Sequence, residues 1–195
     1  MKRKALFAAV AVAASLTCAS CVDHSLNSWI SDKDWVFEDK LLGSWVGHDE
    51  DEKLTFTFTR QGSGYRLDWV DEKAKTKEIQ KFSFDITMGR VSGKLYLDYT
   101  PVLPAACTDP TGVLVTHGLA RIDLADNSFT LRLVNSGRLE NAAKHNQLKD
   151  IQFAWQSRDD LLLTSPTTEL RAFLLAHAQE DDFFNEPSSS FVRQK

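Results

Sequence analysis

The chain has 195 residues, of which 43% are hydrophobic and 26% charged, a composition that supports one domain with a core of its own. The formal net charge is −4, and removal of residues 1–20 would leave 20 Lys and Arg against 27 Asp and Glu, a net charge of −7. This acidic balance argues against nucleic acid as a partner and against electrostatic docking to anionic lipid.

The first segment of the chain has the pattern of a secretory signal. Residues 2–4 are basic, and residues 5–16 form an apolar run broken only by Ser15. The run is too short for a membrane-spanning helix, which needs roughly 20 apolar residues, and no later run is longer. We therefore predict a signal peptide over residues 1–20. The alternative interpretation is a buried N-terminal helix.

Two cysteines follow the apolar run. Ala19-Ser20-Cys21 resembles the end of a bacterial lipobox, in which two small residues precede a cysteine that takes a diacylglycerol through its sulfur. Cys18 stands where that motif usually has Leu, and it is itself the rival lipidation site, preceded by residues 15–17. The resemblance implies a lipid anchor on Cys21 and a mature chain that begins there. Ordinary cleavage to a soluble secreted protein is the alternative.

The anchor has consequences for the other thiol and for the compartment. With Cys18 removed and Cys21 lipidated, Cys107 is the one free cysteine, so we expect no intramolecular disulfide. A redox or zinc site at the two early cysteines would need a folded scaffold and further ligands, which the sequence does not supply. Inner-membrane retention of a lipoprotein favours Asp directly after the lipidated cysteine, and this chain has Val22 at that position. We therefore expect the protein in the outer membrane, facing the periplasm.

The body of the chain follows a polar stretch. Residues 22–34 show no strong periodicity, and we predict a tether over residues 21–39 and a single domain over residues 40–195. Trp29 and Trp35 are expected to cover apolar edges of that domain, with a partner contact as the alternative.

Most of the domain has the pattern of β-strands. Residues 54–59 alternate Leu or Phe with Thr, the period-2 pattern of a half-buried strand. Short strands at close intervals, with gaps too short for helical crossovers, predict a mainly β fold with a closed antiparallel barrel. The further predicted strands are residues 42–47, 65–69, 82–86, 95–99, 117–124, 129–133, 151–155, 161–164 and 190–193.

Two short helices are predicted in the C-terminal half. The first spans residues 137–147 with Ser136 as its N-cap, and the second follows Ser165 and Pro166, a cap and a residue suited to the first turn. In the second helix, Leu170, Phe173, Leu174 and His177 share one face toward the core, where we interpret His177 as a packing residue.

A short motif resembles that of the lipocalin group. Gly43 and Trp45 form a Gly-x-Trp pattern at the start of the first predicted barrel strand. In lipocalins the Trp closes the barrel floor and an Arg near the last strand packs on it, which implies that role for Arg193. The order of further motifs, among them KLYLDYTP, HGLARIDL and FNEPSSSFVRQK, resembles a family of uncharacterised bacterial envelope proteins with a lipocalin-like barrel. That family has no assigned activity, so no catalytic residue carries over.

No motif in the sequence predicts catalysis, a metal or a cofactor. A nucleophile elbow, a P-loop and a HExxH motif are all missing. The acidic run over residues 48–53 lacks the spacing of a calcium loop and is interpreted as a solvated turn. Cys107 with His117 is the one pair that could support a hydrolase, and we regard a non-enzymatic protein as the better interpretation.

The expected function is binding. A lipid-anchored barrel in the cell envelope could hold a small apolar ligand or a protein partner, and the alternatives are a structural or assembly component without a ligand and a soluble secreted barrel. The number of aromatic residues favours a filled core over an open cup. The residues expected to line either one are Phe56, Phe58, Leu67, Trp69, Phe82 and Phe84.

Overall fold

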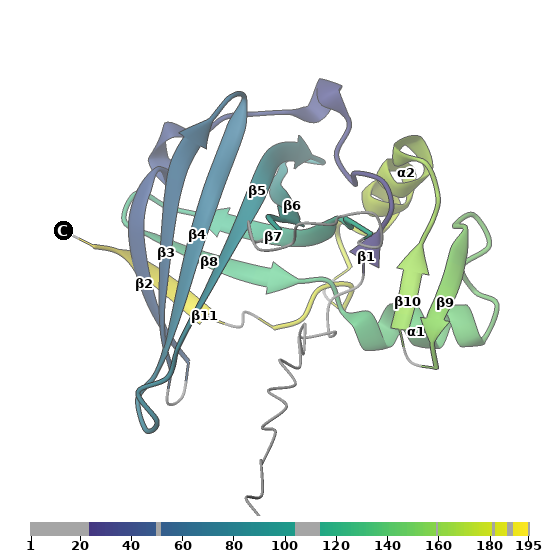
Figure 1. Ribbon diagram of the computed structural model, residues 1–195. Coiled ribbons are helices and arrows are strands. Elements are labelled where there is room, and N and C mark those ends of the chain that lie inside the picture. The colour runs from purple at the N-terminus through teal and green to yellow at the C-terminus, as the bar shows by residue number, and fades with distance from the viewer. Residues whose placement is uncertain are drawn as a thin grey trace, which may run out of the picture.

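A computed structural model describes residues 24–49, 52–103, 114–158, 160–180, 182–186 and 189–194 (Figure 1). Its barrel strands are β2 (Gly43–Asp49), β3 (Glu52–Gln61), β4 (Gly64–Lys73), β5 (Ile79–Val91), β6 (Lys94–Pro101), β7 (Gly118–Leu124), β8 (Ser128–Leu133) and β11 (Ser189–Arg193). The remaining elements are β1 (His24–Ser25), β9 (Phe153–Ser157), β10 (Asp160–Leu163), helices α1 (Ser136–Lys144) and α2 (Thr167–His177), and the 3-10 turns η1 (Asp32–Asp34) and η2 (Asp39–Leu41).

Eight strands close a barrel in the order β11-β2-β3-β4-β5-β6-β7-β8, and every neighbouring pair is antiparallel. A separate sheet has the order β1-β10-β9. The prediction of a mainly β, lipocalin-like antiparallel barrel with two helices in the C-terminal half is confirmed.

Alternation along the strands separates the interior from the outer wall. On β3, Leu54, Phe56 and Phe58 are buried while the threonines between them are half-buried on the other face. The β3–β4 hairpin turns at Gly62, whose φ of +58° is a conformation that glycine adopts without steric cost. The period-2 pattern of the sequence therefore determines which side chains fill the barrel.

Aromatic rings fill the centre of the barrel. The Phe129 ring centroid lies 4.7 Å from that of Phe191 and 5.0 Å from that of Trp45. The Phe56 ring centroid lies 4.4 Å from that of Phe191. Contacts of this kind contribute beyond the area they bury, so the rings form a packed core at this level of the barrel.

One end of the barrel is closed by the Gly-x-Trp motif. The Arg193 guanidinium carbon lies 4.1 Å from the Trp45 ring centroid, the contact that the resemblance to lipocalins implies. The Trp45 indole N–H donates to the Leu41 carbonyl at 2.8 Å, and Arg193 Nη1 donates to the Leu42 carbonyl at 2.8 Å. Gly43 has a φ of +110°, and a Cβ there would come within 3.0 Å of Arg193 Nη1. Glycine is therefore required at this corner.

A second core lies outside the barrel wall, under α1, α2 and the small sheet. Figure 1 shows α1, α2, β9 and β10 gathered on one side of the barrel, away from β2 and β3. The residues that form this second core are Trp29, Ile30, Val91, Tyr96, Leu119, Val134, Leu139, Ala143, Leu148, Ile151, Leu161, Leu163, Leu170, Leu174, Phe183 and Phe184.

The chain from His24 onward packs along the barrel, within the range predicted as a tether. Trp29 is fully buried, whereas Trp35 is 45% exposed. Asp98 on β6, itself buried, accepts hydrogen bonds at 2.7 Å from the Trp29 N–H and from the Ser28 hydroxyl. These bonds fasten the N-terminal segment to the outer wall.

Both helix caps differ from the prediction. The α1 cap is Asn135, whose side-chain oxygen accepts from the Arg138 N–H at 3.1 Å, so the prediction of Ser136 was wrong by one residue. The helix ends at Lys144, three residues before the predicted end, and Asn146 is left-handed at φ 55°.

At α2, Pro166 occupies the N-cap position and no side chain caps the helix, so the prediction of Ser165 was also wrong. The Ser165 hydroxyl instead accepts from the Gln152 N–H at 2.7 Å and donates to Glu169 at 2.8 Å.

Candidate functional site

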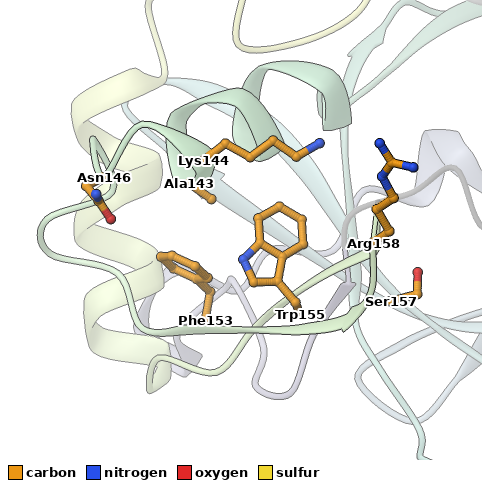
Figure 2. A pocket seen from close by; sticks show the side chains of 7 residues that line it. All are labelled: Ala143, Lys144, Asn146, Phe153, Trp155, Ser157 and Arg158. Atoms are coloured by element: carbon orange, nitrogen blue, oxygen red, sulfur yellow. The ribbon is translucent and has the colours of Figure 1, made fainter.

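A groove lies between α1 and β9 on the side of the molecule opposite β2 and β3. It has a volume of about 490 Å³. Figure 2 shows Phe153 and Trp155 side by side along the strand, with the Lys144 chain extended above the indole and Arg158 beyond it. The lining residues are Ala143, Lys144, Asn146, Phe153, Trp155, Ser157 and Arg158.

Local structure explains how the groove forms. On α1, Leu139 and Ala143 are buried against the second core, which leaves the last turn and Lys144 at the rim of the groove. On β9, Phe153, Trp155 and Ser157 are two residues apart and therefore share one face of the strand. That face looks toward α1, so the helix and the strand form the two walls.

Two aromatic rings form the floor. The Phe153 and Trp155 ring centroids are 6.3 Å apart with planes at 83°, an edge-to-face pair. Trp155 is 39% exposed, although a side chain of its size is usually well buried. Tryptophan is enriched among the few residues that carry most of the binding energy at protein interfaces.

Both charged residues that line the groove, Lys144 and Arg158, are basic, although the chain as a whole is acidic. Lys144 Nζ lies 5.5 Å from the Trp155 ring centroid, within the range of a cation–π contact, and 3.5 Å from the Glu140 carboxylate on the preceding turn of α1. Arg158 is exposed at the other end, and within the described part of the chain no carboxylate forms an ion pair with it. An acidic group is therefore the natural counterpart of this end of the groove.

The strand β9 is the edge of its sheet. Within the described residues it pairs with β10 alone, in the register Phe153↔Leu163, Ala154↔Leu162 and Trp155↔Leu161. Four of the five residues of β9 are exposed. Natural proteins usually cover or charge such an edge, because its unpaired backbone groups attract other strands.

The residues predicted to line the barrel lie at different depths. Phe56, Phe58 and Leu67 are buried in the barrel core, and Trp69 and Phe84 are partly buried beside it. The Phe82 ring lies beside that of Trp69, tilted by 50° with centroids 5.2 Å apart, yet Phe82 is 42% exposed. These residues thus run from the packed centre to the rim.

Two buried polar atoms at that rim lack a hydrogen-bond partner among the described residues. The Trp69 indole nitrogen and one carboxylate oxygen of Asp71, a residue 8% exposed, form no hydrogen bond within the described residues. Buried polar atoms normally find a protein or water partner. This end of the barrel is therefore polar inside as well as aromatic.

Of the pair Cys107 and His117, only His117 lies among the described residues. His117 Nδ1 lies 2.6 Å from Asp98 Oδ1, a contact that orients the imidazole. Because the same carboxylate binds Ser28 and Trp29, its contacts also hold the N-terminal segment. Cys107 lies outside the described residues, as do Cys18 and Cys21.

Sequence reasoning missed the groove. The strand over residues 151–155 was predicted, but nothing in its alternation marked it as an edge strand beside a helix. The available signal was Trp155 followed at close range by Arg158, an aromatic and a cation at the end of a strand.

None of the described helices has the length and apolarity needed to cross a bilayer. The described part of the chain also holds no cluster of three His, Cys, Asp or Glu residues suited to a metal ion. Comparison with family models, with curated proteins and with solved structures finds no match to this chain.

Proposed function

We propose that the protein is a non-enzymatic, lipid-anchored component of the bacterial cell envelope that binds a partner protein through the groove between α1 and β9. The observation that carries the binding role is Trp155, a large aromatic side chain left 39% exposed on an edge strand, in a groove that two basic residues also line. The filled barrel core supports the same role, because packed rings leave the barrel as a scaffold for the groove.

The N-terminal sequence supports the compartment. The basic and apolar start of the chain, followed by Ala19-Ser20-Cys21, favours lipidation of Cys21, and Val22 favours the outer membrane with the protein facing the periplasm. The expected mass of the envelope-extracted protein is that of residues 21–195 plus a diacylglyceryl group and an acyl chain. Cys21→Ser should abolish this product, whereas Cys18→Ser should leave it unchanged. An unmodified secreted product from the wild-type gene would refute the anchor.

Site-specific photo-crosslinking in living cells tests the binding role. A photoreactive phenylalanine analogue at Trp155 should give one adduct of defined mass with an envelope protein. The matched control is the same analogue at Leu175, an exposed apolar residue on α2 that is 45% accessible. Equal labelling at both positions, or no adduct at Trp155 while the protein is folded and correctly localised, would contradict the proposal.

A small ligand at the barrel rim is a second candidate. The observation that favours it is the pair of unpartnered buried atoms on Trp69 and Asp71, beside the exposed Phe82 ring. Native mass spectrometry of the protein extracted from envelopes tests it. A retained small-molecule adduct that disappears in Asp71→Leu supports this candidate, and a bare mass under gentle conditions counts against it.

A further inference from the structure

The backbone of β9 is arranged to accept another strand. The Thr164 N–H donates to the Gln152 carbonyl at 2.8 Å, which makes these two residues a hydrogen-bonded pair. Because such pairs alternate along an antiparallel ladder, Ala154 is bonded to β10, whereas the N–H and C=O groups of Phe153 and Trp155 point away from it.

The other side of β10 gives an independent check. The Leu163 carbonyl accepts from the Leu26 N–H at 2.9 Å, on the β1 side of the strand. Leu163 is the partner of Phe153 in the register, so its backbone groups face away from β9. The pair is therefore not hydrogen-bonded, and the Phe153 backbone groups face outward as the alternation requires.

We propose that the partner contributes an extended segment with acidic side chains, which pairs with Phe153 and Trp155 of β9 as an added strand. This inference rests on the proposed partner-binding function and specifies its chemistry. Strand addition obtains its affinity from main-chain hydrogen bonds and its specificity from alternate side chains. Here alternate side chains of the added strand would contact the Trp155 face.

The side chains determine which residues the added strand should carry. Figure 2 shows the Lys144 chain above the Trp155 ring and the Arg158 side chain beyond it, so a carboxylate at the edge of the indole nearest Arg158 has a cation beside it. An apolar residue two positions away would lie on Phe153, because same-face side chains recur every second residue. The favoured segment therefore alternates and carries an acidic residue opposite Trp155.

A random peptide library selected on the immobilised full-length protein tests the inference. The enriched peptides should share an acidic residue and an alternating apolar pattern. Their affinity for Arg158→Glu should fall by about tenfold or more, because the charge complement is reversed. Lys81→Glu is the matched control, since Lys81 is exposed on the barrel strand β5 and does not line the groove, and it should leave the affinity unchanged.

Amide hydrogen exchange distinguishes strand addition from side-chain docking. On binding of an enriched peptide, exchange at Phe153 and Trp155 should slow by on the order of tenfold or more, while Ala154, already bonded to β10, changes little. A peptide N-methylated at the residues facing β9 should lose affinity. No enriched peptide, unchanged exchange at both residues, or equal binding to Arg158→Glu would overturn the inference.

The remaining outcomes separate the two proposals. A crosslink at Trp155 in cells together with unchanged amide exchange would leave partner binding intact and overturn strand addition. A dimer in sedimentation of the peptide-free protein, abolished by substitution of Trp155 with Asp, would assign the edge to a second copy and also overturn it.

Discussion

Phe129→Ala measures how fully the barrel interior is packed. Phe129 is 1% exposed and its ring contacts Trp45 and Phe191 at centroid distances of 5.0 and 4.7 Å. Removal of a phenylalanine ring from a packed core costs about 3–5 kcal/mol, because the lost transfer free energy adds to that of the cavity left behind. We expect a loss of this size in the free energy of unfolding, and a fall in Tm of about 10 °C for a domain of this length.

Urea unfolding followed by tryptophan fluorescence gives the value, with Val192→Ala as control because Val192 is 56% exposed. The control should change the free energy of unfolding by less than about 0.5 kcal/mol. Added benzene should stabilise Phe129→Ala and leave the wild type unaffected, since an apolar cavity of that kind stays dry and binds such rings. A loss below about 1 kcal/mol would refute the packed interior and favour an open cup.

Three further predictions concern single contacts. Arg171 donates to Asp34 at 2.5 and 2.8 Å, and these hydrogen bonds lower the pKa of Asp34. Asp34→Asn should therefore lower the free energy of unfolding by about 1–2 kcal/mol at pH 7. In urea titrations the wild type and the variant should converge as the pH falls below about 3.9, where the unfolded carboxyl is protonated. Burial lowers the pKa of His24, so the unfolded chain binds a proton more readily than the folded one and stability should fall as the pH drops below about 6.5. His24→Gln should flatten that part of the curve of stability against pH, and an unchanged slope would contradict this prediction. Gly43→Ala should cost about 1–3 kcal/mol through its φ of +110° and the approach to Arg193, measured as a fall in Tm, and a neutral effect would show that the corner relaxes.

The barrel was predictable because its strands have simple alternation. Successive side chains of a strand point to opposite faces, so Phe56 and Phe58 point inward while Thr55 and Thr57 point outward. This alternation is enough to define the two faces of a half-buried sheet. The contact of Arg193 with Trp45 joins residues 148 positions apart, and only the resemblance to lipocalins implied it. Pattern alone does not identify the partner of a side chain across the barrel.

The groove was not predictable for a related reason. Alternation over residues 151–155 identifies a strand, but whether that strand is central or at an edge depends on which other strands lie beside it. Likewise, the contact of Lys144 with Trp155 depends on how α1 packs on the second core. The buried Trp29 follows the same rule, since its burial depends on the outer wall of β6 and not on its own neighbours.

Closure of the barrel by β11 has a kinetic consequence. This strand pairs with β2 on one side and β8 on the other, so the sheet closes only after segments from opposite ends of the chain meet. Such long-range pairing is slow, and until it occurs the edges of β2 and β8 stay open to other chains. A chain truncated before Phe191 would keep both edges exposed, so β11 protects the newly made chain from aggregation.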